Sequence, residues 1–225
     1  MKGKLILFLL ISIAVACNND DDTNTTPSGL IYHYYPVNVG HEVIYNASLI
    51  TKDEFSGNED TSFYQIKEVI ESVFLDDEGR QTQRLERYTR DTPNDPWIIA
   101  DVWTSNRTTN HVEKREENIS YVKLVFPITN SVTWNGNALN TEEPKEYEYE
   151  DLHIADVVGG ISFDSTLTVL QMEFQDSFIK QYEVEKYAPG VGMIYKNFIE
   201  VNFAFPSPGI KSQTLYTETI VSWSN

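Results

Sequence analysis

The segment that decides the fold runs from Phe63 to Phe74 and reads FYQIKEVIESVF. Large apolar side chains at Tyr64, Ile66 and Ile70 fall on alternate positions, which places them on one face of an extended chain. Twelve extended residues span about 40 Å at about 3.3 Å each, whereas an ordinary strand has about five or six residues. Strands of this length favour a strongly twisted, curled antiparallel sheet over an immunoglobulin-like sandwich.

The same alternation recurs along the chain. It marks residues 41–51, 97–107 and 146–150, and a last strand near Trp223. Clusters of Gly, Pro, Asn and Asp separate these runs and predict turns. We therefore expect a mainly β fold with about nine or ten strands and little helix: a long, curled antiparallel sheet of the half-barrel or β-clam type. A short helix near residues 150–158 is compatible with the pattern.

The apolar pattern changes sides within residues 163–175. Leu167 and Val169 share one parity, whereas Leu170 and Met172 share the other. A β-bulge produces such a change, and curled sheets need bulges. The alternative is a central strand that is covered on both faces.

Composition excludes several classes of protein. Seventeen basic residues against thirty-four acidic ones give a formal net charge of −17, which argues against nucleic-acid binding. A single cysteine excludes a disulfide framework and a cysteine-based metal site. The sequence contains no zinc-protease, nucleophile-elbow, P-loop or dinucleotide-binding motif. We therefore expect no catalytic residues, no metal and no cofactor, with a hydrolase built from distant residues as the alternative.

The N-terminus has the pattern of an export signal. Residues 1–16 combine Lys2 and Lys4 with an apolar run of twelve residues that begins at Leu5. Twelve helical residues span about 18 Å, which is too short for the roughly 30 Å core of a bilayer. Residues 17–29 then read as an acidic, solvated tether, and residues 30–225 as a single β domain.

Ala14-Val15-Ala16-Cys17 resembles the lipobox of bacterial lipoproteins. The resemblance implies cleavage before Cys17, a lipid on its sulfur and acylation of its new amine with a fatty acid such as palmitate. Two or more acyl chains hold a protein stably on a membrane, where one chain does not. The alternative is a plain secretory signal in which the cysteine occurs by chance.

An acidic run follows the cysteine at Asp20, Asp21 and Asp22. Such a run resembles the surface-export signal of lipoproteins in the Bacteroidota. It implies an anchor in the outer leaflet of the cell outer membrane, facing outward. An anchor that faces the periplasm is the alternative.

Three motifs mark a family. They are the opening at residues 35–40 (YPVNVG), the stretch from Lys123 to Pro127 that continues to WNGN at 134–137, and YAPGVG at 187–192. Together they resemble a family of uncharacterised Bacteroidota cell-surface lipoproteins with a YFPL-x-x-G-like start and a YAPGVG turn. The resemblance implies a curled sheet similar to the half-barrel of bacterial lipoprotein carriers, and it brings no catalytic residues.

Two segments offer ligand contacts. Trp134, Asn135 and Asn137 surround an Asn-Gly turn, and an exposed indole between amides would suit a sugar ring. A Trp that is tucked into the core is the alternative. Tyr147 and Tyr149 alternate with glutamates, so they share one face and would either line a concave pocket or fill the core.

These observations favour a non-catalytic binding or interaction module that is anchored to the lipid bilayer of the outer membrane through Cys17. An aromatic-lined concave face suits an apolar ligand. The alternative is a glycan-binding lipoprotein of a surface polysaccharide-uptake system, which suits the Trp and Tyr content and the location.

Overall fold

The structure is a computed structural model and describes residues 31–130, 132–206 and 209–225. The predicted signal peptide (1–16), the tether (17–29), the lipidation site Cys17 and the acidic residues Asp20, Asp21 and Asp22 lie outside the described residues.

The described chain is almost entirely β, which confirms the predicted fold class. It forms one antiparallel sheet of twelve strands, where the sequence predicted about nine or ten. The elements are a short 3-10 helix η1 (Ile31–Tyr34), β1 (Glu42–Asp53), β2 (Asn58–Leu75), β3 (Gln81–Arg90), β4 (Ile98–Arg107), β5 (His111–Glu116), β6 (Ile119–Val125), β7 (Thr133–Asn135), β8 (Glu146–Val158), β9 (Ile161–Gln175), β10 (Ile179–Ala188), β11 (Gly192–Phe203) and β12 (Ile210–Ser224). The deciding segment lies within β2, an 18-residue strand.

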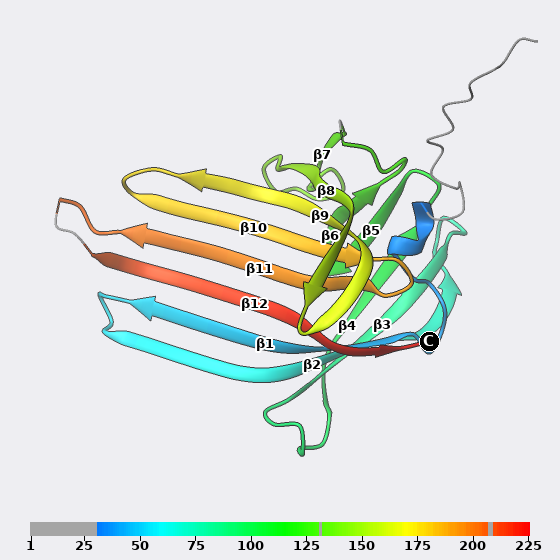
Figure 1. Cartoon of the computed structure of the whole chain (residues 1–225), viewed down its shortest axis with the longest axis horizontal. Helices are drawn as coiled ribbons and strands as arrows, with labels where there is room; N and C mark the ends of the chain where they lie inside the picture. Colours follow the sequence, from blue (N-terminus) through cyan, green and yellow to red (C-terminus); the bar gives the residue numbers. More distant parts are fainter. Residues whose placement is uncertain (1–30, 131, 207–208) are drawn as a thin grey trace, which may run out of the picture.

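The order of strands explains how the sheet curls. It is β6-β5-β4-β3-β2-β1-β12-β11-β10-β9-β8-β7, so the chain runs outward to one edge at β6 and starts again from the other edge at β7. The sheet bends until these two edges meet at one end of the molecule, while β1, β2 and β9 to β12 extend beyond this closed part as an open sheet (Figure 1).

A line of hydrogen bonds joins the two edges, and we call it the seam. The backbone N–H of Val122 on β6 donates to the carbonyl of Gly136, at 2.9 Å. The indole N–H of Trp134 donates to the carbonyl of Val122, also at 2.9 Å. Asn140 Nδ2 donates to the carbonyl of Ser120 at 2.8 Å. Edge strands that would otherwise expose unpaired backbone groups are therefore partly satisfied by each other.

Bulges bend the sheet at the predicted place and at others. β9 shifts register against β10, so Gln171 has no partner between Leu170 and Met172, and this confirms the bulge predicted from the change of parity. β6 shifts register against β5 in the same way at Lys123. A bulge residue leaves the regular alternation of side chains, and both of these residues line the hollow of the curl.

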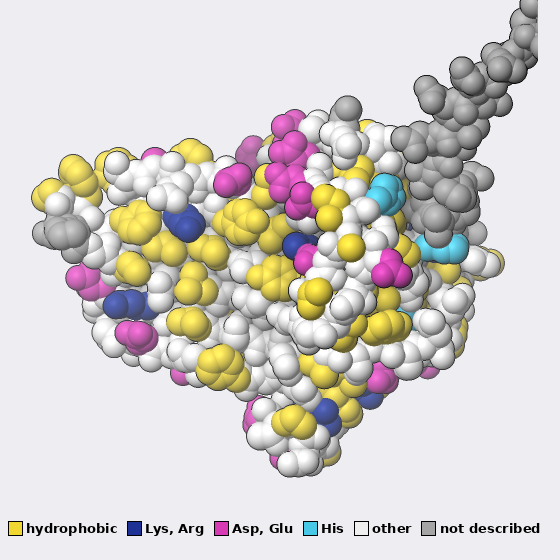
Figure 2. All heavy atoms as spheres, viewed as in Figure 1, with side chains coloured by type: hydrophobic (Ala, Val, Ile, Leu, Met, Phe, Trp, Pro, Cys, Tyr) yellow, Lys and Arg dark blue, Asp and Glu magenta, His cyan; other side chains and the backbone are white. Residues whose placement is uncertain are grey.

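Two large apolar clusters form the core, beside a small one of Ile70, Leu85 and Trp103. One surrounds Tyr147, Tyr149, Leu167 and Tyr187 inside the closed part, and the other joins β1, β11 and β12 to the β8–β9 hairpin. On β8, Tyr147 and Tyr149 are buried and the glutamates between them are exposed, as the alternation predicted. Acidic side chains accordingly gather on the outer surface over β8, and apolar side chains are spread over the open sheet (Figure 2).

Two local expectations had different outcomes. Pro189-Gly190 forms the turn between β10 and β11, and Gly190 has a φ of 75°, as a type II turn requires. The short helix considered for residues 150–158 is wrong, because this segment is paired with β9 as part of β8, although irregularly. Within the described residues, no helix is long and apolar enough to span a membrane.

Candidate functional site

The predicted ligand residues meet at the seam, and most of their polar groups are already used there. The ring of Trp134 packs against Tyr147 and Tyr149, with centroids 5.9 and 4.7 Å apart. The Tyr149 hydroxyl donates to the carbonyl of Val125 at 2.7 Å and accepts from its N–H at 2.8 Å. The indole N–H of Trp134 is bonded across the seam, as described above. Trp134 and Tyr149 thus hold the two edges together.

The two asparagines stabilise the loop that follows β7. Asn135 Oδ1 accepts from the backbone N–H of Asn137 at 3.0 Å and of Lys145 at 2.9 Å. Asn137 Nδ2 donates to the carbonyl of Glu143 at 2.6 Å. Of the five predicted residues, Asn137 and Tyr147 also line a hollow, and this hollow is the candidate site.

The hollow lies beside the seam at the mouth of the closed part, and we call it the seam groove. Its volume is about 470 Å³, within the roughly 300–1,000 Å³ typical of small-molecule sites. Its lining combines aromatic rings, amides and paired charges: Glu116, Ile119, Tyr121, Lys123, Asn137, Glu142, Lys145, Tyr147, Gln171, Glu183, Lys196 and Phe198.

The charges in the groove balance. Three glutamates and three lysines line it, so their formal sum is zero in a chain of net charge −17. Lys145 Nζ lies 2.6 Å from Glu183 Oε2, and Lys123 Nζ lies 3.2 Å from Glu116 Oε1. Lys196 lies 3.9 Å from Glu116. Each lysine of the groove therefore already has a carboxylate partner.

Gln171 is a buried polar side chain of the groove with an unpartnered hydrogen-bond donor. It is 5% exposed, and its Nε2 is buried with no hydrogen-bond partner among the described residues. A buried amide N–H₂ without an acceptor costs free energy, so a position of this kind calls for an explanation. Gln171 also borders a second hollow, of about 370 Å³, beside β8 and β9. The side chain lines both hollows, so a turn of its amide toward either one would present these donors to an acceptor on a ligand.

Gly136 determines where the ring of Tyr147 can lie. A Cβ at this position would be 2.2 Å from Cζ of Tyr147, far inside van der Waals contact. The absence of a side chain lets the phenol lie directly over the backbone of the seam. Tyr147 reaches the groove only because residue 136 is glycine.

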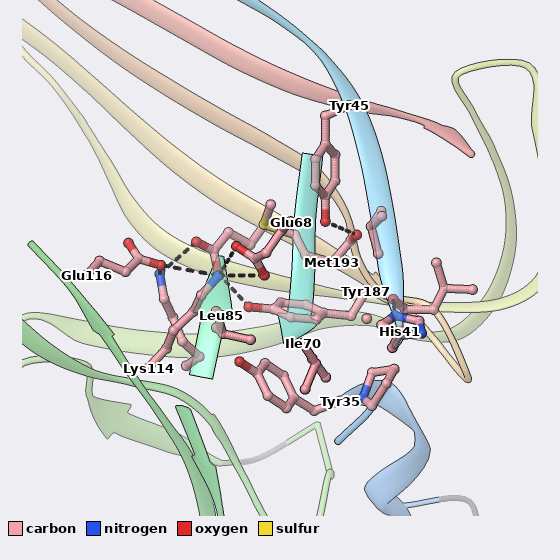
Figure 3. A pocket seen from close by; sticks show the side chains of 16 residues that line it. Tyr35, His41, Tyr45, Glu68, Ile70, Leu85, Lys114, Glu116, Tyr187 and Met193 are labelled. Atoms are coloured by element: carbon pink, nitrogen blue, oxygen red, sulfur yellow. Dashed lines mark hydrogen bonds and ion pairs between the residues drawn. The ribbon is translucent and has the colours of Figure 1, made fainter. Parts of the chain in front are cut away.

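Behind the groove, the closed part holds a buried ionic network, and part of it lines the small void drawn in Figure 3. Four cations and four anions from seven strands alternate in it, so its formal charge is zero; they are Arg87, Lys114, Lys123, Lys196, Glu68, Glu116, Glu185 and Glu218.

Three ion pairs of the network are 3.0 Å or shorter. Lys114 is 2.8 Å from Glu68, and Lys123 is 2.9 Å from Glu185. Arg87 Nη2 donates to Glu218 at 3.0 Å. Glu185 is 1% exposed, so its charge depends on these partners and not on water.

The network fixes the charge state of its members. Burial alone would lower the pKa of Lys123, but the carboxylates of Glu116 and Glu185 raise it well above its ordinary value. Burial alone would raise the pKa of Glu185, but Lys123 and Lys196 lower it. The pKa of Glu116 is lowered in the same way, against its burial, by Lys123, Lys196 and Lys114. All three groups are therefore charged at neutral pH.

Little space remains inside the closed part. The void between the network, Tyr35, Tyr45 and Tyr187 amounts to about 40 Å³, enough for a few waters and too small for an acyl chain. Tyr45 closes one side by donating to the carbonyl of Met193 at 2.9 Å. This geometry counts against an apolar ligand within the closed part.

Only some of these residues could be identified from sequence. The change of parity in β9 marked a bulge, so Gln171 was within reach of sequence reasoning. Lys196 and Phe198 carried no signal, because nothing local shows that β11 faces β6. No group of three or more His, Cys, Asp or Glu side chains in the described part of the chain is arranged to hold a metal ion.

Two buried glutamines give opposite expectations for stability. We expect Gln171→Met to leave the free energy of unfolding unchanged or raised, because it removes an unpartnered N–H₂ and keeps the volume. Gln65 is also buried, but its Nε2 donates to Asn46 at 2.8 Å and its Oε1 accepts from Arg90 at 2.9 Å. Gln65→Met should therefore cost about 1–3 kcal/mol.

Urea unfolding of both variants measures the difference. Equal losses of stability in the two variants would show that Gln171 is an ordinary structural residue.

Comparison with known proteins gives distant structural similarities. No family model matches the chain, and no curated protein matches it. Among solved structures, it is similar to a Bacteroides fragilis protein described as exported and as having a YmcC-like fold, with a TM-score of 0.46, 10% identity and coverage of 86% of this chain and 99% of that one. It is also similar to a Parabacteroides distasonis protein described as a lipoprotein, with a TM-score of 0.39, 13% identity and coverage of 85% and 98%.

Proposed function

We propose that this chain is a lipoprotein of the cell outer membrane, anchored through Cys17 and exposed at the surface, that binds a polar ligand in the seam groove without converting it chemically. The anchor rests on the export signal, the lipobox-like Ala14–Cys17 and the acidic run that follows. Its acyl chains would keep the β-sheet beside the membrane while the groove meets solutes from outside.

The observation that carries the binding role is the buried, unpartnered Nε2 of Gln171, a residue that lines a groove of about 470 Å³. Three rings, from Tyr121, Tyr147 and Phe198, stand in the same groove. Apolar surface with a few convergent polar groups is the usual composition of a ligand site.

The lining supports binding rather than catalysis. It contains no histidine, serine or cysteine that would act as a nucleophile with its base. Glu116 and Glu183 are held by lysines, and the lowered pKa of Glu116 suits an ion-pair partner better than a general acid.

A screen of the acylated protein in detergent tests this function. Neutral oligosaccharides, anionic oligosaccharides, peptides and nucleotides are compared by the shift that each causes in the melting temperature. We expect one class to stabilise the protein and Phe198→Ala to weaken that binding at least tenfold, because it removes a ring from the groove.

Ile199→Ala is the matched control. Ile199 is the next residue of β11, so its side chain points to the opposite face of the sheet. Its variant should bind as the wild type does. If no class binds, or if both variants bind equally well, the groove is not a binding site.

A further inference from the structure

We propose that the ligand of the seam groove is an uncharged oligosaccharide. This inference rests on the proposed function and adds the chemical class of the ligand. It follows from three properties of the groove: its rings, its balanced charges and the engaged strand edge beside it.

The rings come from three strands that are distant in sequence. Tyr121 lies on β6, Tyr147 on β8 and Phe198 on β11, and all three line the groove. Aromatic rings offer flat apolar faces. A pyranose is rich in hydroxyl groups, but the C–H groups on its faces can pack against such a ring. The ring of Tyr147 is 3% exposed and packed over Gly136, so the platforms with exposed surface are Tyr121 and Phe198.

The charges select against charged ligands. An anion would have to compete with Glu183 for Lys145, or with Glu116 for Lys123, and these pairs are 2.6 and 3.2 Å apart. A cation would have to compete with the lysines for Glu116 and Glu183, and only the exposed Glu142 lacks an ion pair among the described carboxylates of the lining. A hydroxyl group both donates and accepts, so it can accept from Gln171 Nε2 and donate to a carboxylate without breaking an ion pair.

The backbone selects against an extended peptide. A peptide that adds a strand needs an edge with free N–H and C=O groups. Beside the groove, the edge of β6 is engaged by the seam through Val122 and Ser120. An edge that is engaged in this way is not free to take an added strand, whereas the polar side chains of the lining suit a ligand that is read through its hydroxyl groups.

Isothermal titration of the acylated protein in detergent tests the ligand class. The neutral probes are maltohexaose, cellohexaose, laminarihexaose and mannohexaose, and the anionic probe is hexagalacturonate. We expect at least one neutral probe to bind at least tenfold more tightly than hexagalacturonate. Gln171→Met should weaken that binding at least tenfold, and Gln65→Met should leave it within twofold.

A change of charge gives a gain-of-function test. Glu183→Gln frees Lys145 and makes the groove positive by one charge, so hexagalacturonate should bind at least tenfold more tightly than it does to the wild type. Glu142→Gln is the control, because it also removes one negative charge from the lining of the groove. The carboxylate of Glu142 is exposed and has no ion-pair partner in the described residues, so its removal frees no lysine. It should change the affinity for hexagalacturonate much less.

The outcomes separate this inference from the proposed function. If the protein binds an anion or a peptide, and Phe198→Ala abolishes that binding, the groove is a binding site but its ligand is not an uncharged oligosaccharide. Neutral-sugar binding that Gln171→Met and Phe198→Ala both leave intact would place the sugar elsewhere and overturn both.

Discussion

Lys123→Met is expected to lower the free energy of unfolding by about 3–5 kcal/mol, because it leaves the carboxylate of Glu185 buried without its nearest cation. A loss of this size is a large part of the roughly 5–15 kcal/mol that stabilises a typical domain. Urea unfolding of the acylated protein in detergent, at neutral pH, measures it.

A second variant keeps this prediction testable if Lys123→Met does not fold. The double variant Lys123→Met/Glu185→Gln removes one cation and one anion, so the rest of the network stays balanced. We expect it to recover at least half of the loss, since replacing both partners of a buried pair is often close to neutral.

A surface pair supplies the control. Lys186 and Asp156 are 2.6 Å apart, but their side chains are 29% and 32% exposed. Lys186→Met should therefore cost less than about 1 kcal/mol. Equal costs for Lys186→Met and Lys123→Met would show that burial of the network contributes nothing to stability.

The dependence on pH follows from the same groups. The pKa values of Glu116 and Glu185 are lowered in the folded state, so their contribution is present above the ordinary carboxyl value of about 4.3 and is lost as the pH falls below it. The pKa of Lys123 is raised, so its contribution is present below about 10.4 and is lost at higher pH. The cost of Lys123→Met should shrink in acid, where the stranded carboxylates take up protons.

Cys17→Ser is expected to release the protein from the membrane completely. Cys17 is the only cysteine of the chain, so no other thiol can carry the lipid. Each buried methylene of an acyl chain contributes about 0.8 kcal/mol to membrane binding, and two or more chains make the anchor stable. Fractionation of cells and labelling with a palmitate analogue measure the two losses together.

The acidic run provides the partner variant for this experiment. Replacing Asp20, Asp21 and Asp22 by Ala should leave the protein acylated and membrane-bound, but protected from protease added to intact cells. If the Cys17→Ser variant stays in the membrane fraction although it incorporates no palmitate label, the proposed lipid anchor at Cys17 is contradicted. Unchanged protease sensitivity in the aspartate variant would contradict the export signal.

Much of the fold was predictable because period-two patterns report local geometry. The alternation in Phe63–Phe74 gave the long strand and the curl, and the change of parity in β9 gave the bulge at Gln171. Alternation in β8 also gave the shared face of Tyr147 and Tyr149. β7, with three residues, is too short to show a pattern, which accounts for one of the strands missing from the predicted count.

The site could be predicted only in part, because it depends on contacts between distant segments. Glu68 and Glu218 look like ordinary solvated acids in their strands, and only the pairing through β1 brings both to Arg87. Lys123 occupies a bulge that no change of parity reveals. Asn137 and Tyr147 were identified from sequence, but the lysines and glutamates around them emerged only when the sheet closed at the seam.

The central claim is that the ligand lies in the seam groove against Gln171, outside the filled interior. An NMR titration of amide-labelled protein with the neutral hexasaccharide of highest affinity tests it most directly. We predict that the largest shifts belong to the side-chain amide of Gln171 and to backbone amides near Tyr121 and Phe198. Shifts that instead cluster around Tyr35 and His41 at the closed end, with the Gln171 amide unmoved, would contradict the account.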